Sequence, residues 1–237
     1  MIGGRAVGRS GGRWHTPLLF VVVAVLTARP PDRLFAQVGH DPANSPYRDI
    51  RLGATVRVVV GQFGGSRGRV PVGPSDGPTG GLRLHYAVGG TLAFTAGVAY
   101  AQTDAFFFDP TDSVPQAKGP INSDLILADG GLQASLTGGK TWHGLQPYVG
   151  ATIGFVFGSE FASDTSGYGF GTKFSYGPEA GVRWYPARRL SVELGWRLVW
   201  YRLQYPLSYR PKLLPLNAPL TETTKHPWAT VSVGWTF

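Results

Sequence analysis

The stretch Pro227–Phe237, PWATVSVGWTF, sets a pattern that recurs along the chain. From Ala229 onward small or polar residues alternate with apolar ones, which are Ala229, Val231, Val233, Trp235 and Phe237. Successive side chains of a β-strand point to opposite sides, so this alternation predicts a strand with one apolar and one polar face. A length of about ten residues is what a tilted strand needs to cross a bilayer.

Seven further segments alternate in the same way: 51–61, 81–88, 92–100, 124–137, 146–157, 170–185 and 190–201. Segment 124–137 is the least regular, because Leu125 and Leu127 share a face with Asp129 and Gln133. The segments are joined by connections that are alternately long (64–78, 103–123, 159–168 and 204–226) and short (89–90, 139–145 and 186–189). Short periplasmic turns and longer outside loops are typical of bacterial membrane barrels. We therefore predict an all-β fold, an eight-stranded antiparallel up-and-down transmembrane β-barrel with its short turns on the periplasmic side.

The first 36 residues have the features of an export signal. Three arginines, at positions 5, 9 and 13, precede the apolar run Leu18–Leu26, and Ala36–Gln37 offers a cleavage point. The run is shorter than the roughly 20 residues that a membrane-spanning helix needs. We predict a cleavable signal peptide at 1–36, with an uncleaved anchor as the alternative, a periplasmic strap at 37–46 and the barrel domain at 47–237.

Composition narrows the possible functions. The formal charge of +8 falls to +4 without residues 1–36, so the basic character is weak evidence for a nucleic-acid partner, and none is expected. The absence of cysteine excludes disulfides, thiolate metal sites and a cysteine nucleophile. The high content of Gly (34) and of aromatic residues (7 Trp, 10 Tyr and 13 Phe) suits a narrow barrel whose ends lie at a water–lipid boundary.

The volume of the side chains indicates which face points outward. An eight-stranded barrel has an interior only wide enough for packed side chains or one small ligand. The polar faces carry mostly Gly, Ala, Ser and Thr, whereas the apolar faces carry Trp, Phe, Leu and Val on nearly every strand. We therefore predict that the apolar faces contact lipid. The alternative is a soluble, lipocalin-like barrel whose apolar faces surround a ligand.

This sidedness places charged residues inside the barrel, where they must be paired or hydrated. The predicted interior cations are Arg51, Arg57, Arg83, Lys173, Arg183 and Arg197, and the predicted interior acids are Asp129, Glu179 and Glu193. Our candidate charged network has seven members: Arg57, Arg83, Lys173, Glu179, Arg183, Glu193 and Arg197. Within it, Glu179 is expected to pair with Arg183 along one strand, and Glu193 with Arg197 along the next. The network is either a salt-bridged, hydrated plug or, given its surplus of cations, an anion-binding or gated narrow pore.

The signal peptide, the eight alternating strands and the terminal GWTF resemble the small bacterial outer-membrane β-barrel proteins. The resemblance implies insertion in the cell outer membrane, contact with outer-membrane lipid and lipopolysaccharide, and recognition by the outer-membrane assembly machinery. It also assigns an assembly signal to Phe237, which is otherwise another lipid-facing residue. Aromatic belts are expected at both boundaries: Trp184, Trp235 and Phe237 near the short turns, and Tyr100, Phe157 and Trp200 toward the long loops.

Signals of catalysis are weak. Matches to G-x-S-x-G occur at 8–12, 64–68 and 73–77, but no predicted helix follows either loop match, as a nucleophile elbow requires. His85 has no serine beside it on its face and is expected to be an interior polar residue. We expect no catalytic, metal-binding or cofactor-binding residues. Some proteins of the resembled class act on lipid acyl chains, so a lipid-modifying membrane enzyme is the weaker alternative.

A specific molecular function of this protein is expected to reside in its long loops, because binding residues concentrate in loops held by a rigid scaffold. Two of them are unusually apolar, at Phe106–Phe108 and at 213–220 (LLPLNAPL), and are expected to pack together, cover the barrel mouth, rest on lipopolysaccharide or contact a partner. We predict a monomeric, non-enzymatic protein with a structural or surface-interaction role. The alternative is porin-like passive passage of a small solute, hydrophobic or anionic.

Overall fold

The computed structural model describes residues 45–108, 112, 116–158, 168–210 and 213–237. The predicted signal peptide and most of the predicted strap lie outside the described residues. No helix in the described part of the chain is long and apolar enough to cross a membrane.

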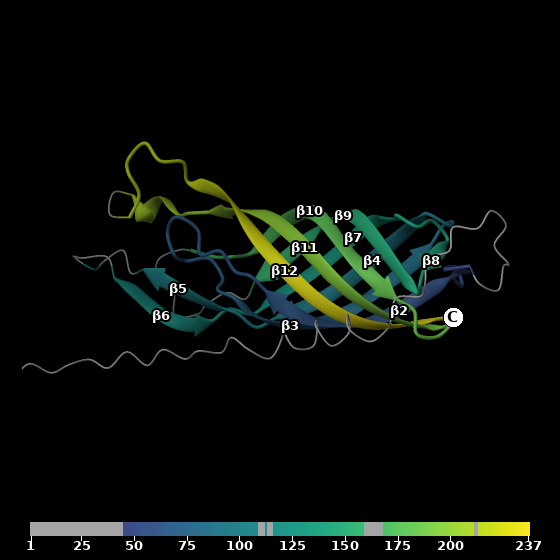
Figure 1. The fold of residues 1–237 in the computed structure, drawn as a ribbon. Helices are drawn as coiled ribbons and strands as arrows, with labels where there is room; N and C mark the ends of the chain where they lie inside the picture. Colours follow the sequence, from purple (N-terminus) through teal and green to yellow (C-terminus); the bar gives the residue numbers. More distant parts are fainter. Residues whose placement is uncertain (1–44, 109–111, 113–115, 159–167, 211–212) are drawn as a thin grey trace, which may run out of the picture. The chain divides into compact units, whose positions relative to one another are not determined.

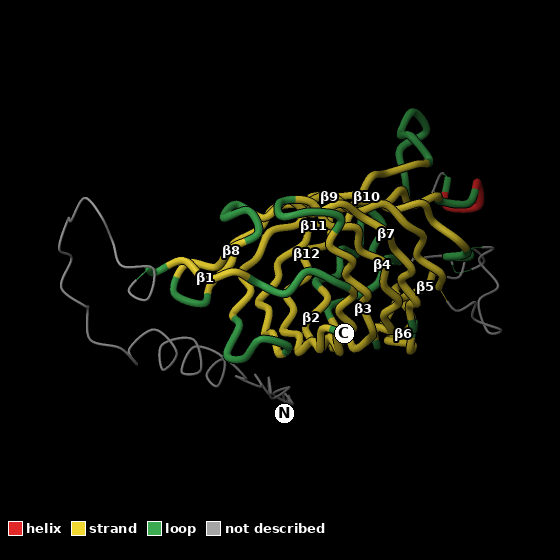
Figure 2. The backbone as a smooth tube through the Cα atoms, turned by 90° about the vertical axis from the view of Figure 1, so that its right-hand side faces the viewer, coloured by secondary structure: helices red, strands yellow, loops and turns green. Residues whose placement is uncertain are grey.

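Eight long strands form a closed barrel, in which each strand pairs antiparallel with the next and the last returns to the first (Figures 1 and 2). This confirms the predicted all-β up-and-down barrel. The strands are β2 (Ala54–Phe63), β3 (Gly77–Ala87), β4 (Leu92–Ala101), β7 (Leu125–Ser135), β9 (Leu145–Gly158), β10 (Thr172–Trp184), β11 (Leu190–Gln204) and β12 (Thr221–Thr236).

Short elements extend the barrel at its two ends. At the end with the short turns, β1 (Tyr47–Asp49) pairs with β8 (Lys140–Trp142), and the C-terminus lies nearby (Figure 1). At the other end β5 (Asp104–Phe108) and β6 (Ala117–Asn122) form a hairpin, and a single 3₁₀ turn, η2, spans Leu207–Tyr209. The hairpin corrects the prediction of a loop at 103–123. Gly119 and Pro120 lie within β6, and such residues indicate a loop when only the sequence is read.

The pairing register fixes the tilt of the strands. Following paired residues once around the barrel from Trp235 leads back to Lys225 on the same strand, a stagger of ten residues. Ten residues correspond to about 33 Å along a strand, and eight strand spacings to about 38 Å around the barrel, so the strands tilt by about 40°. Strands of 10 to 16 residues at this tilt are long enough to cross a bilayer.

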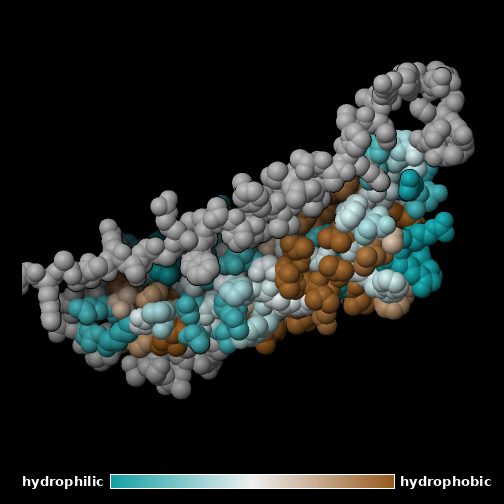
Figure 3. Space-filling view, turned by 60° about the horizontal axis from the view of Figure 1, so that its bottom comes forward, coloured by the Kyte–Doolittle hydropathy of each residue, from teal (hydrophilic) through white to brown (hydrophobic). Residues whose placement is uncertain are grey.

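The apolar rows of the strands point outward. Large apolar side chains from every barrel strand remain exposed, including Val58 (58%), Ile153 (61%) and Leu194 (49%), whereas polar residues of the opposite rows, such as Thr55 and Ser232, are buried. On the face shown in Figure 3, hydrophobic side chains gather over the middle of the barrel and hydrophilic ones lie toward its ends. The predicted sidedness is confirmed, and the lipocalin-like alternative is wrong for this chain.

The two faces of the β11–β12 ribbon exchange polarity near the long-loop end. The outward residues of β11 are apolar up to Trp200 and then become Arg202 and Gln204, while the inward residues change from Arg197 to the buried Val199, Tyr201 and Leu203. On β12 the outward residues Lys225 and Thr223 are exposed, and His226 and Trp228 are buried inside. On the short-turn side of this change the outer face of the ribbon is apolar and suits lipid, and on the long-loop side it is polar and suits water. The exchange explains why the sequence predicted a loop over 204–226, where β11 in fact continues to Gln204 and β12 begins at Thr221.

Exposed aromatic side chains lie toward both ends of the lipid-facing wall. Trp184 and Trp235 lie at the short-turn end, with Phe237 just beyond β12, and Tyr100 and Phe157 lie toward the long loops. Trp200 is half-buried and packs edge-on against Tyr176, with 5.4 Å between ring centroids. These are the positions of aromatic belts at the two membrane boundaries.

A charge placed in the middle of the outer wall tests the lipid-facing assignment. Leu194→Arg is expected to lower the free energy of unfolding from lipid vesicles by about 2–4 kcal/mol, because the guanidinium would lie near the bilayer midplane. Gln204→Arg, on the same outward row but above the polarity change, is the matched control and should cost close to nothing. Equal stabilities in a urea titration would contradict the assignment.

Candidate functional site

The half of the barrel interior nearer the short turns holds an interior network of charged residues. Strand alternation directs these side chains inward from five strands, and none has a side chain more than 12% exposed. The network contains four arginines and three carboxylates: Arg57 on β2, Arg83 on β3, Asp129 on β7, Glu179 and Arg183 on β10, and Glu193 and Arg197 on β11.

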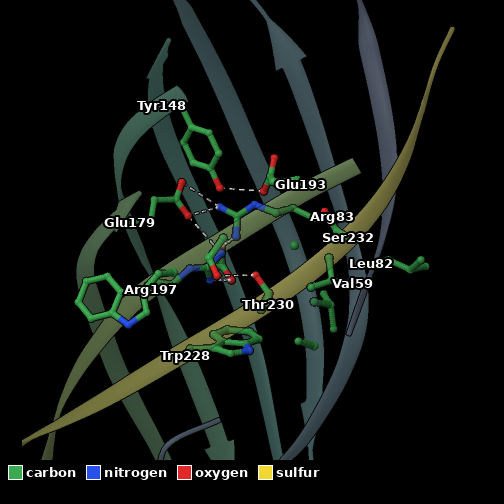
Figure 4. A pocket seen from close by; sticks show the side chains of 16 residues that line it. Val59, Leu82, Arg83, Tyr148, Glu179, Glu193, Arg197, Trp228, Thr230 and Ser232 are labelled. Atoms are coloured by element: carbon green, nitrogen blue, oxygen red, sulfur yellow. Dashed lines mark hydrogen bonds and ion pairs between the residues drawn. The ribbon is translucent and has the colours of Figure 1, made fainter. Parts of the chain in front are cut away.

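Two arginines and two carboxylates close a ring of ion pairs across the interior. Arg83 contacts Asp129 (Nη1–Oδ1, 3.2 Å) and Glu179 (Nη2–Oε2, 3.1 Å). Arg197 contacts the same two acids, at 2.8 Å from Asp129 Oδ2 and 3.3 Å from Glu179 Oε2. Figure 4 shows Arg83 reaching between Glu179 and Arg197. The ring is neutral, because it contains two arginines and two carboxylates, and each member has two partners of opposite charge.

Glu193 is the centre of a second group, closer to the short turns. Its Oε2 accepts a 2.7 Å hydrogen bond from Arg183 Nε, and its Oε1 accepts a 2.8 Å hydrogen bond from the Tyr148 hydroxyl. The Arg183 guanidinium also lies 4.2 Å from the centroid of the Tyr148 ring. Arg57 Nε is 3.5 Å from the same Glu193 Oε2. This group therefore has two cations and one acid.

Gln133 joins the two groups. Its Nε2 donates a 2.7 Å hydrogen bond to Glu179 Oε1, and its Oε1 accepts one from Arg183 Nη2. Sequence reasoning assigned no role to Gln133 or Tyr148, although both lie on the inward row of their strands. Neutral side chains give no signal in a search for charges, so their contribution emerges only from the packing.

The ion pairs differ from those that the sequence suggested. Among the described residues no ion pair joins Glu179 to Arg183 or Glu193 to Arg197. Residues four apart on one strand are separated by about 13 Å, whereas directly opposite residues on adjacent strands are about 5 Å apart. The register places Arg183 opposite Glu193 and Glu179 opposite Arg197, so partners are found across strands.

Two predicted interior cations lie outside the network. Arg51 is exposed and precedes β2. Lys173 is half-buried near the long-loop end of β10, with its ammonium 6.0 Å from the centroid of the Phe170 ring. Within the described residues it has no ion pair. The surplus of cations in the interior network is therefore one rather than three.

The space left beside the ring is small. A cavity of about 30 Å³ is bordered by side chains of both groups and by Trp228 and Ser232 (Figure 4). A buried water needs about 10–15 Å³ of such space, so the cavity has room for about two waters. At this level the barrel is filled rather than open.

The half of the interior nearer the long loops is apolar, which the sequence did not predict. Buried residues from the strands, including Phe63, Leu125, Leu127, Val156, Tyr201 and Leu203, form one cluster there. Leu125 and Leu127 point into it, which explains the irregular pattern of segment 124–137. Trp228 borders the charged half, since the Arg197 guanidinium lies 4.8 Å from the centroid of its ring.

Residues of the long loops complete the apolar cluster. Val70 and Val72 from the first loop, Phe108 from β5, and Tyr209 and Leu214 from the last loop are all buried in it. Of the uses considered for the apolar loop stretches, the structure shows that Phe108 and Leu214 cover the barrel mouth. A stack of Phe63, His226 and Tyr201 lies below them, with centroid distances of 5.3 and 4.1 Å.

Glu222 fastens the first loop to the β11–β12 ribbon. Its Oε2 accepts 2.7 Å hydrogen bonds from the Arg69 backbone N–H and from the Tyr205 hydroxyl. Burial, together with this carboxylate, raises the pKa of Tyr205 to about 12. Gly68 has φ +74°, and a Cβ there would lie 2.5 Å from the Tyr205 hydroxyl, so this close approach requires glycine.

No arrangement for catalysis or metal binding is apparent in the described residues. The G-x-S-x-G matches at 64–68 and 73–77 lie in the first loop, and the next element is strand β3 rather than a helix. No group of three or more His, Asp or Glu could hold a metal ion within the part of the chain that the structure describes. His85 is buried in the interior, and neither of its ring nitrogens has a partner.

Comparisons with solved structures define the fold class. The chain is similar to Neisserial surface protein A, with a TM-score of 0.51, 15% identity, and coverage of 78% of this chain and 97% of that one. OprG from Pseudomonas aeruginosa gives a TM-score of 0.47 with 12% identity over 82% of this chain and 99% of that one, and Ail of Yersinia pestis gives 0.36 with 13% over 78% and 100%. The sequence matches no protein-family model and no curated protein.

At such low identity, the likeness to Neisserial surface protein A shows the fold alone. Together with the apolar outer wall, it defines the class: the chain is an eight-stranded transmembrane β-barrel with the fold of small outer-membrane proteins. The apolar outer wall and the tilt and length of the strands fit a barrel that crosses a bilayer.

Removing the shared carboxylate should destabilise the barrel strongly. Glu193→Gln leaves two buried guanidinium groups without their acid and is expected to cost about 3–5 kcal/mol of unfolding free energy. Tyr148→Phe removes a single hydrogen bond to the same carboxylate and should cost less, about 1.5–3 kcal/mol. Urea unfolding from lipid vesicles, followed by tryptophan fluorescence, measures both. A Glu193→Gln variant as stable as the parent would show that the ion pairs do not form.

Proposed function

We propose that this protein is a closed, non-enzymatic outer-membrane barrel that contributes to envelope structure and presents its long loops as an interaction surface. The observation that carries the proposal is the filling of the interior by two layers, a charged one and an apolar one. An ion crossing the barrel must displace the ring of Arg83, Asp129, Arg197 and Glu179 and then cross a cluster whose residues exclude water.

Electrical recording tests whether the barrel is closed. In planar bilayers the full-length mature protein is expected to give no stable conductance steps. Arg183→Ala and Arg197→Ala should remain closed as well, because the apolar layer is intact in both variants. Steady current through the parent, or anion-selective current through either variant, would instead support the gated pore.

The loops also offer apolar contact surface. Leu207 and Leu216 are each 70% exposed, although neighbouring residues of the same loop, Tyr209 and Leu214, are buried. Exposed apolar side chains on a loop are available to contact another molecule. These two leucines are the residues that we assign to surface interaction.

We propose lipopolysaccharide as the lipid partner of the outer wall. Arg202 and Lys225 are exposed on the outward face of the ribbon, next to the half-buried Trp200, and neither has an ion pair among the described residues. The exposed neighbours Thr223, Gln204 and Thr221 add hydrogen-bonding groups and no negative charge. We propose that this face binds phosphate groups at the outer membrane surface.

Substitution of the two cations tests this contact. Arg202→Gln combined with Lys225→Gln is expected to weaken binding of phosphorylated lipopolysaccharide by about 1 kcal/mol per cation and to abolish the preference over dephosphorylated lipopolysaccharide. Arg188→Gln combined with Arg189→Gln, at the exposed periplasmic turn, is the control and should keep the preference. Calorimetric titration of the folded protein with each lipopolysaccharide measures the binding affinity. Equal losses of affinity in both double variants would contradict the assignment.

Passive passage of a hydrophobic solute is the second candidate. The observation that favours it is a hollow of about 650 Å³ in the outer wall, where Ala96, Ala128 and Gly130 lie between larger side chains such as Leu84 and Phe155. Liposome flux of small hydrophobic solutes tests it.

Phe237, which is 66% exposed, remains our proposed assembly signal, and outer-membrane yield after its deletion tests that role.

A further inference from the structure

Arg57 is a buried cation that shares its only acid among the described residues with a second arginine. It is 1% exposed, and its buried Nε has no hydrogen-bond partner among the described residues. Its one ion pair, at 3.5 Å, is with Glu193 Oε2, an oxygen that already accepts a shorter hydrogen bond from Arg183. The other Glu193 oxygen accepts from Tyr148. The single negative charge of Glu193 is therefore shared between Arg183 and Arg57.

The arrangement of charges confirms the surplus. The ring formed by Arg83, Arg197, Asp129 and Glu179 is neutral, so the remaining three charged residues of the interior network leave one positive charge. Leaving a buried charge unpaired is costly, because the low-dielectric surroundings replace little of its hydration. A neutral water could satisfy N–H groups but would leave the net charge unchanged.

Other polar groups around Arg57 also lack partners. Ser191 Oγ, Ser232 Oγ and both ring nitrogens of His85 are buried without a hydrogen bond, and the three residues are 1%, 4% and 7% exposed. The register places Ser191 opposite Gly234, which is opposite Arg57, and places His85 on β3 two residues from Arg83, the residue opposite Arg57. Ser232 lies opposite Glu193.

Gly234 allows this grouping. A Cβ at this position would lie 2.7 Å from Arg57 Cγ and 2.9 Å from Ser191 Oγ, so only glycine lets the arginine stem and the serine hydroxyl come together. The four side chains can each offer an N–H or O–H donor. Among the described residues, the acid that contacts Arg57 is Glu193, which also accepts hydrogen bonds from Arg183 and Tyr148.

We propose that Arg57, Ser191, Ser232 and His85 form a binding site for a small inorganic monoanion, of which chloride is the simplest. One negative charge matches the surplus of one, and the donors match the needs of a halide. The site lies nearer the short-turn end of β2 than the long-loop end. The inference concerns the interior alone and does not depend on the proposed surface role.

Unfolding at constant ionic strength tests the site. The full-length mature protein, folded in detergent micelles, is titrated with urea in sodium chloride or in sodium gluconate, whose anion is too large to enter. We expect chloride to raise the unfolding midpoint in a saturable way. At a chloride concentration ten times the dissociation constant, the folding equilibrium constant should rise about elevenfold.

Two variants locate the effect. Arg57→Gln should remove the difference between chloride and gluconate, and Arg51→Gln, a change at an exposed arginine six residues earlier, should retain it. If Arg57→Gln does not fold, Ser191→Ala provides the second test and should weaken chloride binding several-fold. Bromide at this position in a crystal, located by anomalous scattering, would support the site directly.

Equal midpoints in chloride and gluconate for the parent protein would overturn the proposal and assign only water to these groups. An equal chloride response in Arg57→Gln and in Arg51→Gln would also overturn it, because the anion would then act at the surface. Neither result bears on conductance or on lipopolysaccharide binding, so failure here is distinguishable from failure of the proposed function.

Discussion

The antiparallel pairing between β12 and β2 is the interaction on which the rest of the structure depends. Inside a bilayer no water can satisfy the N–H and C=O groups of a free strand edge, so a sheet must close on itself. Closure with eight strands and a stagger of ten residues leaves an interior only as wide as packed side chains. Every other feature, from the small residues of the inward rows to the paired charges, follows from that narrow interior.

The interior contains two different solutions to the problem of filling a narrow cylinder. Near the short turns, charges are retained, and they persist because each carboxylate has at least two cationic or hydrogen-bonding partners. Near the long loops the same cylinder is filled by aromatic and aliphatic side chains, as in a soluble protein. The second solution is possible there because the β11–β12 ribbon has left the lipid, so its outer face can be polar and its inner face apolar. Loop residues such as Phe108 and Leu214 then complete the core.

Several elements were predictable from the sequence because they depend on local alternation. The eight strands, the sidedness and the inward position of Arg57, Arg83, Arg183 and Arg197 all follow from a period of two combined with the small volume of the interior. The loop predicted at 204–226 was too long, because the alternation changes polarity within strands that continue to Gln204 and begin at Thr221. The β5–β6 hairpin was missed because Gly119 and Pro120 do not suit a strand unless a partner is already in place.

By itself the sequence determined that this chain forms an eight-stranded barrel with a lipid-facing apolar wall, since that information is carried by neighbouring residues of each strand. Only the tertiary structure decided which charges pair. The register sets Arg183 opposite Glu193 and Glu179 opposite Arg197, and closure brings Asp129 of β7 to Arg83 and Arg197. Register and closure depend on the fit of all eight strands at once, which no single segment of the sequence contains.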